Sequence, residues 1–296
     1  MARVPVLINS NAGSAAGDEK IAEKVADAFS KAGIDAEVEL IEGGKCEVRC
    51  LAIVERGDPL VIVGGGDGTI SAAASALAGT ETSLGILPLG TLNHFARDLQ
   101  IAANLQEAVQ LIASGKERQV DIAEMNGRVF INNSAIGLYP LMVIDRDLQR
   151  RRLGRSKRLA MIVASFRTLL RFGHRRLALT VNEERHARVD TPLLFVGNND
   201  YRTDIGAPGQ RESVEGGVLS VYVMRKKTRR GLIAASIRAL LNRSRPDDMV
   251  RIDGVSRLRV SSRKRHLAVS LDGEVVRAEP PLDYRIRKKA LRVIAP

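Results

Sequence analysis

One short segment, Gly64-Gly65-Gly66-Asp67-Gly68-Thr69, combines residue types that could bind a phosphate group and a metal ion. The apolar residues 60–63 before it predict a buried strand, and the alanine-rich residues 70–78 after it predict a helix that ends at Gly79. Glycines at the end of a strand let backbone N–H groups approach a polyphosphate closely, and the start of the next helix adds partial positive charge. Asp67 could hold Mg²⁺ or orient a nucleophile. Taken alone, the segment could also be a tight turn that binds no ligand.

A second loop of the same kind follows further along the chain. Residues 84–87 predict another buried strand, which leads into Pro88-Leu89-Gly90-Thr91-Leu92-Asn93 and then into a helix. Loops at neighbouring strand ends of a parallel sheet would converge on one crevice, which strengthens the prediction of a phosphate site. The sequence contains neither a lysine-bearing P-loop nor a complete Gly-x-Gly-x-x-Gly motif in the first loop, so the predicted site differs from both common nucleotide-binding patterns.

These loops need a parallel sheet to position them, and the first half of the chain predicts one. Strand and helix patterns alternate there, as in sheets that are covered by helices. The expected strands are residues 4–8, 36–41, 60–63 and 84–87, and the expected helices are residues 18–32, 45–56, 70–78, 92–99 and 105–114. From about residue 120, short alternating runs predict a mostly antiparallel β structure, with strands at 120–125, 128–132, 177–181, 192–196, 218–224, 257–260, 267–271 and 282–286. A chain of 296 residues favours two domains.

The two loops together resemble those of the bacterial diacylglycerol kinase and sphingosine kinase-like lipid kinases, which are relatives of the NAD kinases. The Gly-Gly-Asp-Gly-Thr motif at 65–69 is shared by the wider superfamily. The Pro-x-Gly-Thr-x-Asn-x-Phe-Ala-Arg segment at 88–97 is similar to the lipid-kinase branch in particular. Three further segments lie in the order expected of that family: Asn-Ser-Asn-Ala-Gly at 9–13, Asn-Asn-Ser-Ala-Ile-Gly at 132–137 and Leu-Asp-Gly-Glu at 271–274.

The resemblance implies an NAD kinase/diacylglycerol kinase-like fold with the active site between two domains. Residues 1–119 would form an α/β nucleotide-binding domain with a parallel sheet, and residues 120–296 a β-rich, antiparallel, sandwich-like lipid-binding domain. The extreme C-terminus could pack back on the first domain. ATP would be held by Asn9, Ser10, Asn11, Ala12, Gly13, Gly64, Gly65, Gly66, Asp67, Gly68, Thr69, Ile70, Gly90, Thr91 and Asn93, the last of which would also support the geometry of its loop.

Two carboxylates compete for the role of catalytic base under this resemblance. Asp272 would accept the proton of the lipid hydroxyl, with Glu274 beside it for the metal or the nucleotide, whereas Asp67 could face the acceptor instead. Asp272-Gly273 is also a strong signal for an ordinary hairpin turn, and both interpretations can hold if the turn presents the acid. Asp67 is a candidate ligand of Mg²⁺, and Glu215 is a candidate ligand of a second metal site that would tie the β domain together.

The positive charge of the chain is concentrated in one segment. The formal net charge is +12. The segment from Arg146 to Arg176 contains many basic residues and a single acid, Asp147. Apolar residues between them predict basic amphipathic helices, a natural surface for anionic lipid head groups, although a solvated helix face is the alternative. Nucleic-acid binding is disfavoured, because aromatic residues make up only 3% of the chain and no nucleic acid-binding motif occurs. Cys46 and Cys50 lack a second pair for a zinc site and are expected to be buried thiols.

The resemblance therefore implies an ATP- and Mg²⁺-dependent kinase that phosphorylates a hydroxyl of a diacylglycerol-like or other long-chain lipid. The sequence has no apolar stretch long enough to span a bilayer and no signal pattern at its start, which predicts a cytoplasmic protein. The basic segment from Arg146 to Arg176 predicts that it attaches peripherally to the membrane. An NAD kinase-like enzyme and a non-catalytic, nucleotide-binding, membrane-associated protein are the alternatives. The sequence leaves open whether the protein forms a homodimer.

Overall fold

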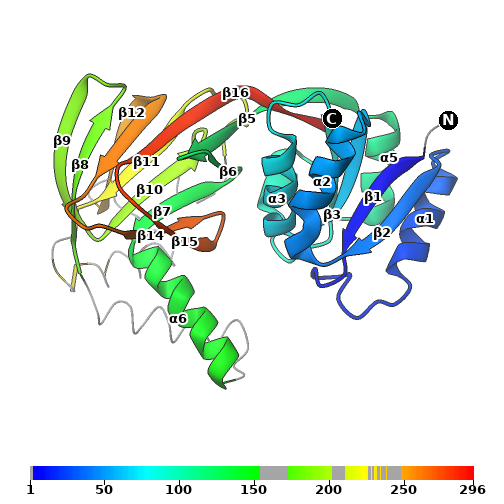
Figure 1. Ribbon diagram of the computed structural model, residues 1–296, viewed down its shortest axis with the longest axis horizontal. Helices are drawn as coiled ribbons and strands as arrows, with labels where there is room; N and C mark the ends of the chain where they lie inside the picture. Colours follow the sequence, from blue (N-terminus) through cyan, green and yellow to red (C-terminus); the bar gives the residue numbers. More distant parts are fainter. Residues whose placement is uncertain are drawn as a thin grey trace.

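The computed structural model describes residues 3–153, 173–201, 211–225 and 248–296, together with residues 228, 230, 231, 234 and 238. Two β-sheets form its frame, one of ten strands and one of six. Helices cover one half of the larger sheet, and the smaller sheet packs on the other half (Figure 1). The molecule therefore has a helix-covered half and a β-rich half.

The first part of the chain builds the parallel half of the larger sheet. Its strands lie in the order β2 (Ala36–Ile41), β1 (Val4–Asn9), β3 (Leu60–Gly65) and β4 (Ser83–Pro88). The helices are α1 (Ile21–Lys31), α2 (Cys46–Glu55) after the 3-10 turn η1 (Gly43–Lys45), α3 (Asp67–Leu77), α4 (His94–Asp98) and α5 (Leu105–Ser114). α1 lies beside α5, and α2 lies beside α3, so that helices cover both faces of the sheet (Figure 1). Apolar residues at helical spacing, such as Ile21, Val25 and Phe29 in α1, face the sheet and are buried.

The remaining chain adds strands to both sheets. The larger sheet continues from β4 through β16 (Leu282–Ala295), β13 (Arg257–Ser261), β8 (Arg175–Val181) and β9 (Arg185–Thr191), while β5 (Lys116–Met125) pairs with β16 and with β6 (Arg128–Phe130). The smaller sheet has the order β12 (Met249–Val255), β11 (Leu219–Met224), β10 (Leu193–Asn198), β7 (Asn133–Gly137), β14 (Leu267–Leu271) and β15 (Glu274–Ala278). Aliphatic residues of both sheets, among them Leu179, Leu258, Leu194 and Val269, form one core between them. Helix α6 (Leu138–Leu153) follows β7 and projects away from the sheets (Figure 1).

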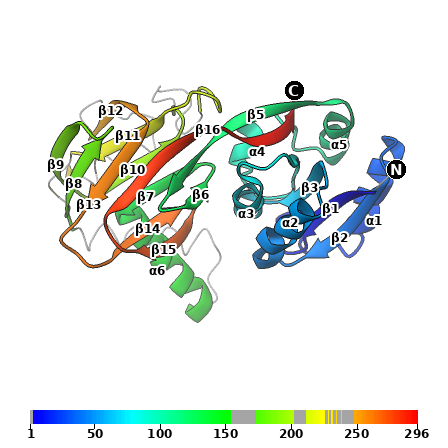
Figure 2. The ribbon, with the colours of Figure 1, turned by 45° about the horizontal axis from the view of Figure 1, so that its top comes forward.

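One long strand, β16, connects the two halves. Its early residue Tyr284 lies in the core between the sheets, whereas Leu291 and Val293 lie in the core of the helix-covered half. β16 pairs antiparallel with β5 and, at Val293, parallel with β4 (Figure 2). The end of the chain thus packs in the first half. The domain boundary between residues 119 and 120 stays a prediction, because the larger sheet runs through both halves.

The predicted fold class is confirmed, with a parallel α/β part followed by an antiparallel β-rich part. The observed elements differ most where polar residues hide the alternating pattern: strands β7, β9 and β12 were not predicted. β16 was expected to end at residue 286, but it continues to Ala295 past a register irregularity between Arg287 and Leu291. Charged residues at this bulge interrupt the apolar alternation on which the prediction relied. Cys46 and Cys50 are buried free thiols, as predicted.

The basic segment from Arg146 to Arg176 lies for the most part outside the described residues. The backbone of α6 is described to Leu153, and its side chains to residue 145. The predicted amphipathic character of the segment therefore stays a prediction. Among the residues that the structure describes, no helix is long and apolar enough to cross a membrane.

Candidate active site

Three glycine-containing loops meet at the carboxyl ends of β1, β3 and β4. The loop after β1 holds Gly13, the loop after β3 holds Gly66, and the loop after β4 holds Gly90. A Cβ atom on Gly90 would lie 2.3 Å from the Cα of Gly66, and a Cβ atom on Gly13 would lie 2.4 Å from the carbonyl oxygen of Leu89. Real Cβ atoms do not approach this closely, so the contact between the loops requires glycine at both positions.

Glycine is also needed at the end of β3, where Gly64 and Gly65 are the last two residues. A Cβ on Gly65 would lie 2.6 Å from the Cβ of Thr69, and one on Gly64 would lie 2.5 Å from the Cδ1 of Ile8. Gly68 is exposed at the start of α3, with open space around it apart from the side chain of Glu274 at 3.8 Å. The loop therefore folds tightly on β1 and leaves its Gly68 end accessible to a ligand.

Asparagine side chains fix the loops that lie next to these glycines. Asn93 adopts a left-handed backbone conformation with φ of 49°. Its Oδ1 accepts the N–H of Gly90 at 3.0 Å, and its Nδ2 donates to the carbonyls of Pro88 and Gly90 at 3.0 and 2.9 Å. Asn9 Nδ2 donates to the hydroxyl of Thr69 at 2.8 Å, which ties the β1 loop to α3. These asparagine side-chain bonds hold the loops in place, and none of them involves the peptide groups of Gly66 and Gly68.

The other residues expected to contact ATP fall into two groups. Ile70 and Ala12 are buried, with Ile70 in the core of the first half, so only their backbone could face a ligand. Asn11 and Thr91 are exposed, and Ser10 is half-buried with its hydroxyl donating to the Ile41 carbonyl at 3.3 Å. The structure thus places the predicted nucleotide-binding residues at the ends of β1 and β3, on the three loops or in the first turn of α3, while their roles stay predictions.

Asp67 is the first residue of α3, directly after the N-cap residue Gly66. Its Oδ1 accepts the backbone N–H of Phe95 at 3.3 Å, which connects the β3 loop with α4. No other protein donor contacts this half-buried carboxylate within the described part of the chain. Asp67 therefore keeps an oxygen open for a ligand at the point where the glycine loops meet.

Asp272 has the opposite environment, because its two oxygens together accept four hydrogen bonds. The backbone N–H groups of Asn132 and Asn133 donate to Oδ1 at 2.8 and 3.0 Å, and that of Ile131 donates to Oδ2 at 2.8 Å. The hydroxyl of Ser71 in α3 also donates to Oδ2, at 2.6 Å. Burial raises the pKa of the Asp272 carboxyl, and the four hydrogen bonds act in the opposite direction with a smaller effect.

The hairpin that carries Asp272 reaches α3 from the β-rich half. Asp272 and Gly273 have φ values of 46° and 86° and form the turn between β14 and β15, as the Asp-Gly signal predicts. Glu274 follows them, and its Oε1 lies 3.8 Å from the position that a Cβ on Gly68 would take. Because Ser71 lies one helical turn after Asp67, the same face of α3 presents Asp67 and touches Asp272.

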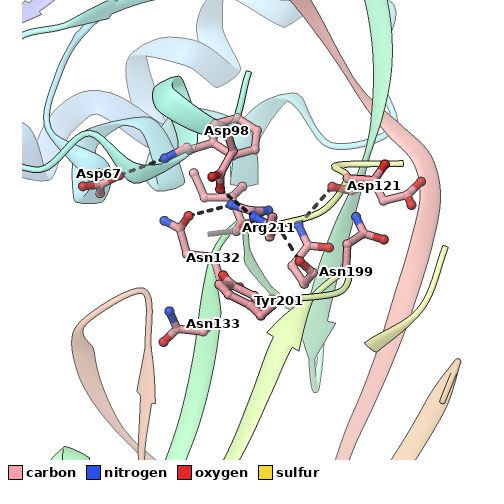
Figure 3. A network of polar contacts seen from close by, with 12 residues as sticks. Asp67, Asp98, Asp121, Asn132, Asn133, Asn199, Tyr201 and Arg211 are labelled. Atoms are coloured by element: carbon pink, nitrogen blue, oxygen red, sulfur yellow. Dashed lines mark hydrogen bonds and ion pairs between the residues drawn. The ribbon is translucent and has the colours of Figure 1, made fainter. Parts of the chain in front are cut away.

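A buried arginine that the sequence did not reveal, Arg211, lies next to Asp98 and Asn132 (Figure 3). The side chain of Arg211 is 1% exposed, and its Nε donates to Asp98 Oδ2 at 2.7 Å. Its other nitrogens donate to Asn132 Oδ1 at 2.8 Å and to the Ile131 carbonyl at 2.7 Å. The guanidinium also lies over the ring of Phe95, 5.5 Å from its centre. Arg211 therefore binds α4 of the first half to the same segment, 131–133, that Asp272 holds.

Tyr201, which follows shortly after β10, completes this network. Its hydroxyl donates to the Asn132 carbonyl at 2.9 Å, and its ring lies 5.7 Å from the Arg211 guanidinium carbon. Burial raises the pKa of Tyr201 to about 12, so that it stays neutral at physiological pH. Asp98 is the last residue of α4, the helix that follows the predicted second loop, and could have been recognised as a candidate from that position. No local sequence signal identifies Arg211 or Tyr201.

The predicted metal ligand Glu215 has a cation as its partner. Its Oε1 lies 2.7 Å from an Arg118 nitrogen, with both side chains more than a third exposed. The nearby Asp121 is buried and accepts the N–H groups of Gly217 and Lys289 at 2.7 and 2.8 Å. Among the described residues, no group of three or more His, Cys, Asp or Glu side chains is arranged to hold a metal. Within the described part of the chain the Glu215 carboxylate is thus paired with Arg118, and its role as a metal ligand stays a prediction.

Residues 3–125 match the family model of the diacylglycerol kinase catalytic domain, which confirms the predicted resemblance. The "Probable lipid kinase YegS-like" protein of Enterobacter sp. (strain 638) is 47% identical over 81 residues, which make up 26% of this chain and 27% of that protein. The protein of the same name from Yersinia pestis (strain Pestoides F) is 44% identical over 81 residues. The aligned part of this chain thus spans about a quarter of the length of these curated relatives, 27% in each case.

Solved structures from Bacillus anthracis strain Sterne share the fold over nearly the whole chain. One of them, whose description names a diacylglycerol kinase, superposes with a TM-score of 0.78 at 23% identity and covers 99% of this chain and 97% of that chain. A second, also described as a diacylglycerol kinase, has a TM-score of 0.70 at 19% identity over the same shares of both chains. At this level of identity the likeness establishes the fold.

Proposed function

We propose that this chain, whose residues 3–125 match the diacylglycerol kinase catalytic domain, is an ATP- and Mg²⁺-dependent kinase that phosphorylates a hydroxyl of a long-chain lipid such as a diacylglycerol. The main observation behind the proposal is that the three glycine loops meet next to the Asp67 carboxylate, which has an oxygen open to a ligand. Phosphoryl transfer needs positioning and charge neutralisation more than covalent help, and this arrangement supplies exposed peptide groups at a helix start next to Asp67.

The environment of Asp67 fits a Mg²⁺ ion. A carboxylate oxygen without a protein donor, next to loops that would hold phosphates, is the kind of ligand that Mg²⁺ takes together with phosphate oxygens and water. When bound there, the ion would neutralise charge that develops on the transferred phosphoryl group. Glu274, which reaches toward Gly68, would serve the nucleotide or the metal from the other side.

Asp272 is our candidate for the base. Its raised pKa favours proton acceptance, but a carboxylate has about four lone-pair positions and all of them are used. Three of the donors are backbone groups of one strand connection, whereas Ser71 is a hydroxyl that can rotate away. A lipid hydroxyl in its place would donate to Asp272 Oδ2, lose its proton there, and attack the γ-phosphorus as the bond to ADP breaks.

The acceptor and the membrane contact belong to the same proposal. The β-rich half would bind the lipid, and the basic segment from Arg146 to Arg176 would hold the protein at an anionic membrane surface from the cytoplasmic side. Reversing several charges among residues 150–158 should weaken binding to anionic vesicles in a salt-dependent way. Reversal of Arg263, Lys264 and Arg265, exposed residues between β13 and β14, is the matched control. Equal vesicle binding by both variants would reject the membrane role of the segment.

Transfer of labelled γ-phosphate from ATP tests the proposal directly. Diacylglycerol, monoacylglycerol, sphingoid base, ceramide, polyprenol and NAD would be offered as acceptors in mixed micelles with Mg²⁺, and Asp67→Asn would be the control. A labelled lipid that is absent with the control would establish the kinase and its acceptor. Labelled NAD would instead establish an NAD kinase-like enzyme. ATP binding without any labelled acceptor from this panel would favour a non-catalytic nucleotide-binding protein.

A further inference from the structure

A basic cavity lies on the larger sheet, away from the glycine loops. It has a volume of about 630 Å³ and is lined by Ser256, Arg257, Arg285, Ile286, Arg287 and Lys288. Four of these six side chains are cations, and none is an acid. We call this feature the basic cavity.

Strand pairing brings the arginines of the basic cavity together. Arg257 of β13 lies directly opposite Arg285 of β16 in the antiparallel register, so their side chains leave the same face of the sheet. Arg287 is two residues further along β16 and shares that face. Like charges directly opposite each other destabilise a sheet unless other charges compensate them. A group of arginines at this place therefore needs an anionic partner.

The residues that the structure describes supply only part of the compensating charge. Glu183 lies 2.7 Å from Arg257, and Glu124 is shared by Arg285 at 2.5 Å and Arg287 at 3.7 Å. In the described part of the chain, no ion pair or hydrogen bond involves the Lys288 ammonium group. Four cations thus face two acids, which leaves a formal surplus of two positive charges.

The basic cavity lies where β16 passes from one core to the other. Ile286 still packs against the core between the sheets, and Leu291 already lies in the core of the helix-covered half. The stem of Lys288 runs close to Gly217, where a Cβ would lie 2.7 Å from its Cε. An Arg287 nitrogen would similarly lie 2.7 Å from a Cβ on Gly79, which belongs to the first half. The cationic side chains are therefore held by contacts from both halves of the molecule.

We propose that the basic cavity binds a phosphate-bearing anion. The charge of a phosphate monoester, about −1.5 to −2 at neutral pH, balances the surplus, and its three terminal oxygens suit the planar donor forks of adjacent arginines. The Ser256 hydroxyl and the Lys288 ammonium group, which also line the cavity, provide further donors. The ligand is either a free phosphate compound or the head group of an anionic phospholipid, since both present the same group.

The double variant Arg257→Gln/Lys288→Gln tests this site with little risk to folding. The Arg257→Gln change removes only the ion pair with Glu183, in which the two side chains are 67% and 75% exposed. Such exposed ion pairs contribute little to stability. Arg263→Gln/Lys264→Gln removes the same charge from exposed positions between β13 and β14 and is the matched control. Inorganic phosphate would be titrated calorimetrically at constant ionic strength. Neither double variant touches the glycine loops, so phosphate bound there contributes equally to both.

We expect phosphate to bind the cavity variant at least about tenfold more weakly than the control variant, because two charge-assisted contacts are lost. Cosedimentation with phosphatidylcholine vesicles, with and without phosphatidic acid, distinguishes the two sources. If the cavity variant binds inorganic phosphate more weakly than the control variant does, the ligand is a free phosphate compound. If the cavity variant binds only the phosphatidic acid vesicles more weakly, the ligand is a lipid head group. If the two variants behave alike with both probes, the basic cavity is not an anion site and the proposal is wrong.

Discussion

The start of α3 and the β14–β15 hairpin each present one carboxylate, and the protein holds the two in opposite ways. Asp67 accepts one hydrogen bond, at 3.3 Å, whereas Asp272 accepts four, at 2.6–3.0 Å. Asp67 is therefore open to a ligand and contributes little to the fold. Asp272 ties the hairpin to segment 131–133 and to α3, so that it contributes to the fold in any case and can take part in chemistry only by exchanging a donor.

Asp67→Asn should have the largest effect on catalysis and almost none on folding. The amide keeps the size and can still accept the Phe95 N–H, but it loses the charge that would bind Mg²⁺. We expect turnover in the phosphoryl-transfer assay to fall on the order of 10² to 10³-fold, the range seen when one electrostatic contact to a transition state is removed. The melting temperature serves as the control and should stay unchanged. Near-normal turnover would remove Asp67 from the site.

Asp272→Ala should show the reverse pattern, with a large loss of stability. The substitution leaves the N–H groups of Ile131, Asn132 and Asn133 without their acceptor, and each unsatisfied buried donor costs about 1–3 kcal/mol. We expect the free energy of unfolding in urea to fall by about 3 kcal/mol or more. Asp67→Ala is the matched control and should cost less than about 1 kcal/mol. Similar losses for both variants would erase the contrast between the two carboxylates.

Gly90→Ala should disturb the loop that carries Asp67 without touching Asp272. The new methyl group would lie 2.3 Å from the Cα of Gly66, so the β3 loop must move. We expect ATP to bind roughly tenfold more weakly, which corresponds to about 1.4 kcal/mol, as measured by calorimetric titration. Gly44→Ala, where a Cβ meets no atom within 4 Å, is the control and should bind ATP normally. Unchanged affinity with Gly90→Ala would mean that the contact between the loops does not shape the nucleotide site.

The sequence predicts the Asp67 loop well because its determinants are local. Glycines, the preceding apolar strand and the following helix lie within one short stretch, and Asn93 fixes its loop through bonds to residues three and five positions away. The fold class follows from the same local alternation of strands and helices. The resemblance then supplies the order of the five motifs along the chain.

The environment of Asp272 could not be predicted, because its partners are distant in the sequence. Ser71 lies 201 positions away, and the three backbone donors lie about 140 positions away. Arg211 and Asp98 are separated by 113 positions and no motif links them. A carboxylate in a hairpin turn gives no sign of how many donors surround it, since this depends on how the two halves pack. The ion pair of Glu215 with Arg118 was missed for the same reason.

Ser71→Ala should have the smallest effect and decides how Asp272 acts. If the lipid hydroxyl replaces Ser71 at Asp272 Oδ2, removing the serine hydroxyl frees that position, and turnover should stay within about threefold of the wild type. If instead the serine passes the proton on to Asp272, its removal should lower turnover on the order of 10² to 10⁴-fold, as loss of a general base does. Asp272→Asn, assayed alongside, should lower turnover under both mechanisms. A Ser71→Ala variant as inactive as Asp272→Asn would therefore overturn the exchange that we propose and make the serine a part of the proton path.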